Sequence, residues 1–185
     1  MEKGLLIDLV DTASEDFFKM DIIRQLGPYI NDAKVLDALC REAVETDSHR
    51  VRDALIQILK GNPVEASRRF SQIAICANYP AHRRWALISL SLMECRDAKE
   101  AVMNGLRDRH RSVRIAAAFN AGLYDDREVV NALELFFERD RFWLVIDGLR
   151  QAGNPLLPLV EKVKKTYGDY HHTREPKGED IPVPG

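Results

Sequence analysis

The 185-residue sequence has few cysteines, no long apolar run and almost no net charge. Its three cysteines, Cys40, Cys76 and Cys95, form no CxxC pair and leave one over, which argues against a disulfide framework or a structural zinc site and favours a reducing, cytoplasmic compartment. No run approaches the roughly 20 apolar residues of a membrane span, and Asp8 interrupts the apolar start, so we expect no signal peptide and no membrane partner. The 27 Lys and Arg nearly balance 29 Asp and Glu, which excludes a uniformly basic nucleic-acid coat and an acidic disordered chain.

Motifs for catalysis are also missing. The sequence has no GxSxG, GxxxxGK[ST], GxGxxG or HExxH motif. His49, His82 and His110 are 33 and 28 residues apart, which matches no metal signature, so we expect their rings to satisfy helix-end groups. No pair of acids stands out as a general acid and base. The sequence therefore favours a non-catalytic protein, without cofactor or metal, over an enzyme.

Helical periodicity dominates the chain. Apolar residues recur at three- and four-residue spacing, as at Val35, Leu36 and Leu39, and short breaks such as residues 61–63 carry Gly, Asn and Pro. No alternating run of β-branched residues predicts a strand. We expect a single all-α domain over residues 1–168 and a polar, flexible tail over 169–185. The predicted helices span residues 3–12, 15–27, 33–46, 49–60, 64–77, 81–93, 97–108, 112–123, 127–138, 142–152 and 156–167.

An internal repeat of 31 residues organises these helices. Arg52, Arg83 and Arg114 follow one another at this spacing. The same shift aligns two further sets, namely the small or apolar residues Ala43, Ala74, Gly105 and Phe136 and their neighbours Val44, Ile75, Leu106 and Phe137. One helix pair cannot bury its apolar stripes alone, so neighbouring pairs must stack and share a core. The repeat therefore predicts a right-handed α-α superhelix, or α-solenoid, of about five helix pairs.

Residues 113–133, with the sequence VRIAAAFNAGLYDDREVVNAL, resemble a short HEAT repeat of the bilin-lyase type. In such repeats a Val-Arg-x-Ala-Ala helix ends near Gly, an Asp-containing turn follows, and a Val-x-x-Leu helix closes the unit. Residues 51–55 and 83–87 match the opening more loosely. The resemblance covers residues 17–168, and it implies a polar ladder in which turn acids, such as Asp47 and Asp140, pair with Arg52, Arg83 and Arg114. HEAT arrays mostly bind other macromolecules, and the repeat itself carries no chemistry.

The distribution of charge suggests where a partner binds. Residues 48–116 carry 13 basic and 6 acidic side chains between two acidic ends. The resemblance implies that second helices line a concave face, and shifting the outward positions Asn131, Glu134 and Glu138 by multiples of 31 extends that face along the chain. The predicted partner-binding residues are Arg41, Arg68, Arg69, Gln72, Lys99, Met103, Arg107 and Glu134, with Glu45 beside them. An acidic segment of a protein partner would suit this patch. The alternative is that these charges pair with acids of neighbouring helices.

Two other functions stay open. The resemblance also includes bilin lyase and isomerase subunits, which would bind an open-chain tetrapyrrole. Trp143 and Asp147 lie one helical turn apart, similar to a Trp-x-x-x-Asp element of alkylpurine DNA glycosylases built from HEAT-like repeats, and with Trp85 and the basic middle they would suit a DNA-binding groove. The alternative for both tryptophans is a place in the helical core.

Overall fold

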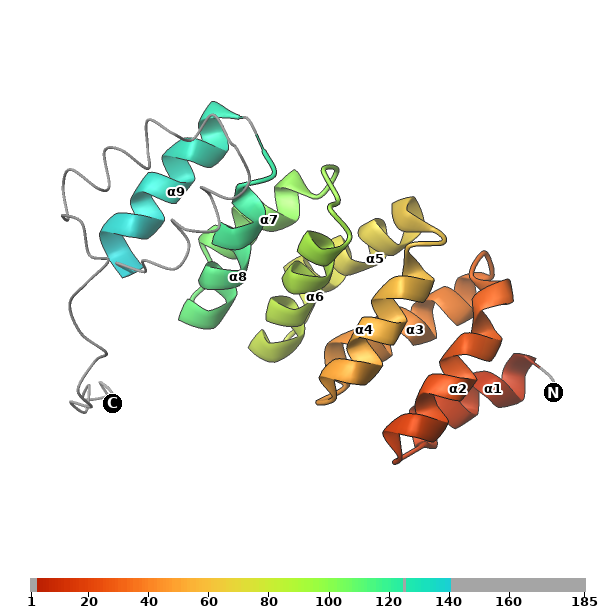
Figure 1. The fold of residues 1–185 in the computed structure, drawn as a ribbon. Coiled ribbons are helices and arrows are strands. Elements are labelled where there is room, and N and C mark those ends of the chain that lie inside the picture. Colours follow the sequence, from red (N-terminus) through yellow and green to blue (C-terminus); the bar gives the residue numbers. More distant parts are fainter. Residues whose placement is uncertain (1–2, 125, 141–185) are drawn as a thin grey trace, which may run out of the picture.

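The computed structural model describes residues 3–124 and 126–140, and all regular structure within these ranges is helical (Figure 1). The all-α class predicted from the periodicity is therefore confirmed. The helices are α1 (Lys3–Thr12), α2 (Asp16–Leu26), a 3₁₀ helix η1 (Gly27–Tyr29), α3 (Ala33–Glu45), α4 (His49–Leu59), α5 (Pro63–Cys76), α6 (Pro80–Leu92), α7 (Lys99–Leu106), α8 (Arg111–Ala121) and α9 (Arg127–Asp140). The predicted helices at 142–152 and 156–167 and the tail at 169–185 lie outside the described residues.

Local chemistry sets where the helices begin. Asp32 caps α3, because its carboxylate accepts hydrogen bonds from the backbone N–H groups of Lys34 and Val35 at 3.0 and 3.3 Å. Ser48 caps α4 through its hydroxyl, and α5 and α6 each begin with a proline, whose missing N–H costs nothing in the first turn. These starts lie within one or two residues of the positions predicted from the sequence.

The helices form two rows that share one core. The odd-numbered helices α1, α3, α5, α7 and α9 each pack against the next, and in the other row α2 packs against α4 and α6 against α8. Figure 1 shows the order running across the molecule from α1 to α9. Between α4 and α6 there is no extensive backbone contact, and α6 packs against α3 instead. The side chains that fill the space between the rows include Leu39, Leu55, Phe70, Leu87 and Leu133, all fully buried.

The 31-residue register identifies buried positions where helices approach closely. Ala43, Ala74 and Phe136 are buried, as is Gly105 in α7. A Cβ at Gly105 would lie 2.7 Å from the Cβ of Ala117 in α8, so only glycine fits there at the observed separation. The register does not hold everywhere, because Ile75 is partly exposed while its equivalents Val44 and Leu106 are buried.

Helix α7 is shorter than predicted, with Lys99–Leu106 in place of residues 97–108. The preceding helix ends in a Schellman motif, in which Glu94 has a φ of 54°, the Cys95 N–H donates to the Leu90 carbonyl and the Glu94 N–H donates to the Ser91 carbonyl. The turn that follows holds the chain out of helical geometry until Ala98. The spacing of apolar residues in the sequence does not predict this extra turn.

Two arginines of the repeat form the predicted polar ladder. Arg83 donates from Nε and Nη2 to the carboxylate of Asp108 at 2.7 and 3.1 Å, and Arg114 donates from Nε to Asp140 at 2.7 Å. The Nη1 group of each arginine also donates to two backbone carbonyls beyond the end of the preceding helix. Each rung thus joins three segments of the chain. Its arginine also supplies donors to backbone carbonyls near a helix C-terminus, which have no partner within the helix.

The third arginine departs from the prediction. Arg52 donates to the carbonyls of Ala43 and Thr46 but has no acid partner among the described residues. Asp47, which the ladder prediction paired with these arginines, makes no ion pair in this part of the chain. The positions equivalent to Asp108 and Asp140 in this rung are Ala77 and Asn78, so the acid is missing from the sequence itself.

Candidate partner-binding face

The predicted binding residues come together on the odd-numbered row. Arg41 lies on α3, Arg68, Arg69 and Gln72 on α5, Lys99 and Met103 on α7, Arg107 at the end of α7, and Glu134 on α9. These four helices pack side by side in that order. The register therefore placed the residues on one row, although their individual environments differ.

Several of the predicted cations are paired within the chain. Arg41 lies 3.0 Å from Asp11 of α1, and Arg69 lies 2.9 Å from Asp37 of α3, so both ion pairs cross between neighbouring helices of the row. Arg68 pairs with Glu65 of its own helix at 3.0 Å. The alternative raised from the sequence, that these arginines pair with acids of neighbouring helices, holds for Arg41 and Arg69 but not for Arg68.

Lys99 also forms ion pairs with neighbouring acids. Its ammonium group lies 2.8 Å from Asp126 and 3.0 Å from Glu128, which join the start of α7 to the start of α9. The hydrogen bond to Asp126 raises the pKa of Lys99, and the same bond lowers the pKa of Asp126. Lys99 therefore stays charged and acts as a clamp between the two helices.

Met103 was predicted to face a partner, and this prediction is wrong. The residue is only 6% exposed and belongs to the core. Helix α7 has eight residues and packs against α5, α6, α8 and α9, so little of its surface reaches solvent. Met103 was assigned to this face because it lies 31 residues before Glu134 of α9. Helix α9 is longer than α7, so the repeat spacing does not account for how closely α7 is surrounded.

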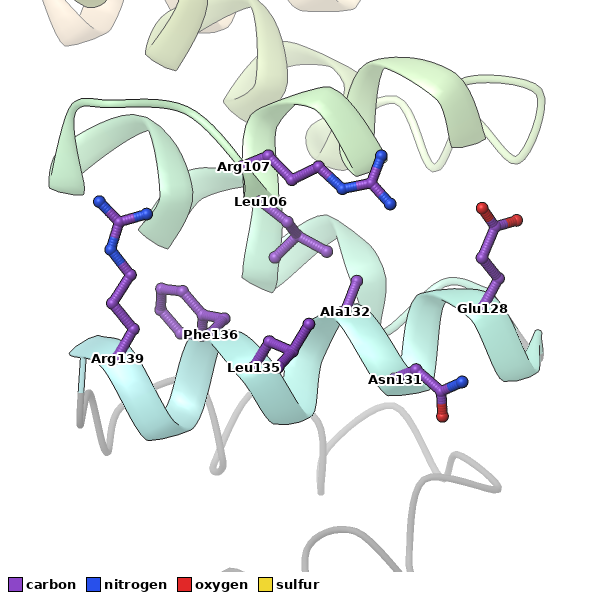
Figure 2. A pocket seen from close by; sticks show the side chains of 8 residues that line it. All are labelled: Leu106, Arg107, Glu128, Asn131, Ala132, Leu135, Phe136 and Arg139. Atoms are coloured by element: carbon purple, nitrogen blue, oxygen red, sulfur yellow. The ribbon is translucent and has the colours of Figure 1, made fainter.

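A cavity of about 340 Å³ opens between α7 and α9, beside Arg107 (Figure 2). Its floor is apolar, with Leu106 and Phe136 buried, and Leu135 stands at its edge with 67% of its surface exposed. Arg107 and Arg139 extend over the floor from the two helices, as Figure 2 shows. The remaining lining residues are Glu128, Asn131 and Ala132.

The charged side chains of this cavity that have no ion-pair partner among the described residues are both positive. Neither Arg107 nor Arg139 makes an ion pair with the residues that the structure describes, whereas Glu128 is held by Lys99. Glu134, also predicted for this face, is partly buried and does not line the cavity. The cavity thus combines an apolar surface with two guanidinium groups that are available to an anion.

Sequence reasoning found Arg107 and Asn131 but missed Leu135 and Arg139. The signal was present, since residues 131, 135 and 139 are four apart and so share one face of α9. Leu135 stands directly before Phe136 and Phe137, and this apolar run gives no sign in the sequence that Leu135 is exposed. Its exposure depends on what packs beside α9.

Elsewhere in the described residues, the side chains that could be reactive have structural roles in the core. Cys40 is buried, as predicted, and burial together with the charge of Asp37 raises the pKa of its thiol to about 12. A thiol with this pKa stays protonated and unreactive. Within residues 3–124 and 126–140, no three His, Cys, Asp or Glu side chains gather in a way that would hold a metal ion.

The histidines lie at helix starts, His49 and His82 in the first turns of α4 and α6 and His110 just before α8. Within the described residues, however, none of their rings bonds a helix-end group as predicted. His49 meets the ring of Trp85 edge-on, with 6.1 Å between ring centroids, and His82 lies against Tyr79. The backbone N–H of His110 donates to Asp108 at the start of α8. Trp143 and Asp147 lie outside the described residues.

Comparison with known proteins adds no relative to this description. The sequence matches none of the protein-family models, and no curated protein is similar to it. None of the helices in the described part has both the length and the apolar character needed to cross a membrane.

Proposed function

We propose that the protein is a non-catalytic scaffold of the HEAT-repeat type, an α-solenoid of about five helix pairs that binds an acidic segment of a protein partner. The 31-residue repeat, the two rows of helices and the arginine ladder support this proposal. Stacked repeats of this kind create extended surfaces suited to macromolecular partners.

The cavity between α7 and α9 carries the proposal. Its volume of about 340 Å³ lies at the lower end of the range for binding pockets. An apolar side chain of the partner would cover Leu135 and the floor, and acidic side chains on either side of it would pair with Arg107 at one end of the cavity and Arg139 at the other (Figure 2). Buried apolar anchors bordered by arginine are typical of the residues that dominate binding energy at interfaces.

A site-specific photo-crosslinker tests this assignment. The photoreactive amino acid p-benzoylphenylalanine is placed at Leu135 and, as a control, at Tyr79, which is equally exposed but lies in the turn between α5 and α6. After irradiation in a cytosolic lysate, the compartment predicted from the cysteines, we expect a discrete protein adduct from position 135 and none from position 79. The adduct should disappear when Arg107 and Arg139 are both changed to Glu.

The same experiment separates the alternative functions. An adduct that nuclease removes would support the nucleic-acid hypothesis, whose affinity should fall steeply with salt because counterions are released. A coloured tetrapyrrole that copurifies without a protein adduct would support the bilin lyase-like hypothesis. Either result, or a protein adduct unaffected by the two charge reversals, would contradict a partner-binding role for this cavity.

A further inference from the structure

The junction between α4 and α6 holds an unusual group of cations around one aromatic ring. The guanidinium carbon of Arg52 lies 3.5 Å from the centroid of the Trp85 ring, and that of Arg84 lies 4.7 Å from it. The ring of His49 meets Trp85 edge-on. We call Arg52, Arg84, Trp85 and His49 the Trp85 junction.

The arginine ladder shows what this junction lacks. Arg83 directs Nε and Nη2 to an aspartate and keeps Nη1 for carbonyls, and Arg114 does the same. Arg52 stands at the equivalent position but spends Nε and Nη2 on carbonyls, because Ala77 occupies the place of the aspartate. The Trp85 ring, rather than a carboxylate, lies against its guanidinium.

Two donors at the junction have no acceptor among the residues that the structure describes. Arg52 is only 2% exposed, and its Nη1 group is buried without a hydrogen-bond partner. The Nε group of Arg84, which belongs to α6, is also buried without a hydrogen-bond partner in this part of the chain. A buried donor of a charged group that makes no hydrogen bond lowers the stability of the fold. Two such donors at one junction therefore indicate that an acceptor is missing.

The charges around Arg52 act in opposite directions. Burial, and secondly the positive charge of Arg84, lower the pKa of Arg52. Asp47 and Asp53 act in the opposite direction through space, but neither forms an ion pair with Arg52 in the described part of the chain. The positive charge of the junction is therefore incompletely compensated.

We propose that the Trp85 junction binds a carboxylate from an acidic side chain of a partner protein, which completes the interrupted rung of the ladder. Aspartate fills the corresponding place in the two complete rungs, and a carboxylate carries two acceptor oxygens, one for each of the two open donors, Arg52 Nη1 and Arg84 Nε. Trp85 and Arg84 are partly exposed and His49 is exposed, so the junction opens to the surface. This site is separate from the cavity between α7 and α9 and does not depend on it.

The test uses the full chain and hexaglutamate as the probe. The sequence has two tryptophans, so ¹⁵N NMR should show two indole N–H signals, which a Trp143→Phe variant assigns. Hexaglutamate should shift the Trp85 signal saturably, and hexaglutamine should not. Arg84→Gln should weaken the response about tenfold, as expected for a hydrogen bond to a charged group.

Three matched variants make the result specific. Arg96→Gln removes an exposed cation outside the junction and Arg107→Gln removes one from the α7–α9 cavity, so both should leave the Trp85 response unchanged. Ala77→Asp supplies the missing acid from within the chain and should abolish the response. If Ala77→Asp does not fold, the comparison of Arg84→Gln with Arg96→Gln still decides.

The proposal is overturned if hexaglutamate leaves the Trp85 signal in place, or if Arg84→Gln binds as tightly as the unaltered chain. It is also overturned if a hexanucleotide shifts the same signal at lower concentration than hexaglutamate, because the junction would then be a phosphate site for nucleic acid. A shift produced equally by inorganic sulfate would likewise exclude recognition of a protein carboxylate.

Discussion

Asp108 holds Arg83 through two hydrogen bonds, one from Nε at 2.7 Å and one from Nη2 at 3.1 Å. The arginine belongs to α6 and the aspartate to the turn between α7 and α8, so this pair ties two repeats together. Both side chains are about nine-tenths buried. The third guanidinium nitrogen of Arg83 donates to the carbonyls of Ala77 and Asn78, which secures the turn after α5 as well.

Replacing Arg83 by Met should destabilise the fold strongly. The change leaves the buried Asp108 carboxylate with the His110 N–H as its remaining donor and takes the donor away from two carbonyls. Breaking a buried pair from one side costs about 3–5 kcal/mol. Urea denaturation followed by circular dichroism measures the free energy of unfolding. Arg68→Met, in the exposed pair with Glu65, should change it by no more than about 1 kcal/mol. Equal losses in the two variants would contradict the role assigned to the ladder.

Stability should fall as the solution becomes acidic, in part because of Asp108. Burial alone would raise the pKa of Asp108, but hydrogen bonds from Arg83 and from the His110 N–H outweigh it and hold the pKa below the ordinary value of 3.8. A carboxyl whose pKa is lower in the folded state contributes stability above its unfolded pKa and loses it as the pH falls through the folded pKa. The contribution of Asp108 should therefore disappear as the pH is lowered from about 4.

Unfolding measured between pH 6 and pH 2 checks this expectation. Asp108→Asn should be less stable than the unaltered chain near pH 6 and should show a shallower decline on acidification. Asp8→Asn, which changes an exposed residue of α1, serves as the control and should keep the original slope. Parallel curves for all three proteins would show that Asp108 does not contribute to the acid sensitivity.

Truncation of Met103 should distinguish a core residue from a binding residue. Because its side chain is buried among four helices, Met103→Ala should lower the free energy of unfolding by about 2–5 kcal/mol. Gln72→Ala, at an exposed position of the same row, should stay within about 0.5 kcal/mol. A stable Met103→Ala protein that lost partner binding would instead restore the prediction made from the sequence.

Adding one methyl group at Gly105 should also destabilise the protein. The new Cβ would lie 2.7 Å from Ala117 and 2.9 Å from Leu87, and such overpacking costs about 1–3 kcal/mol. The better helix propensity of alanine returns only about 1 kcal/mol. Gly4→Ala in α1, where a Cβ meets nothing within 4 Å, should leave the melting temperature unchanged or raise it slightly. A rise for both variants would show that α7 and α8 separate freely.

Much of the local structure could be predicted from the sequence. Apolar spacing and the Gly, Asn and Pro breaks placed the ends of all the described α-helices within about two residues, because both signals act over one or two turns. The 31-residue register identified Arg83 and Arg114 as ladder residues and Asp140 as an acid partner. It also assigned the binding residues to one row, since residues at equivalent positions in stacked repeats share a face.

The candidate sites depended on contacts that the register does not encode. Leu135 and Arg139 matter because of the separation between α7 and α9, and Met103 is buried because a short helix is enclosed by its neighbours. Arg52 meets Trp85 only because α6 packs toward α3 and leaves that side of α4 to side chains.

The sequence by itself determined the helices, their order and the repeated arginines, since hydrophobic periodicity and turn chemistry are properties of neighbouring residues. Tertiary structure decided which charges are neutralised. Arg41, Arg69 and Lys99 are paired, Arg107 lines a cavity, and Arg52 faces a ring in place of an acid. The physical reason is that an ion pair depends on a few ångströms of separation between residues far apart in the chain, and packing sets that separation.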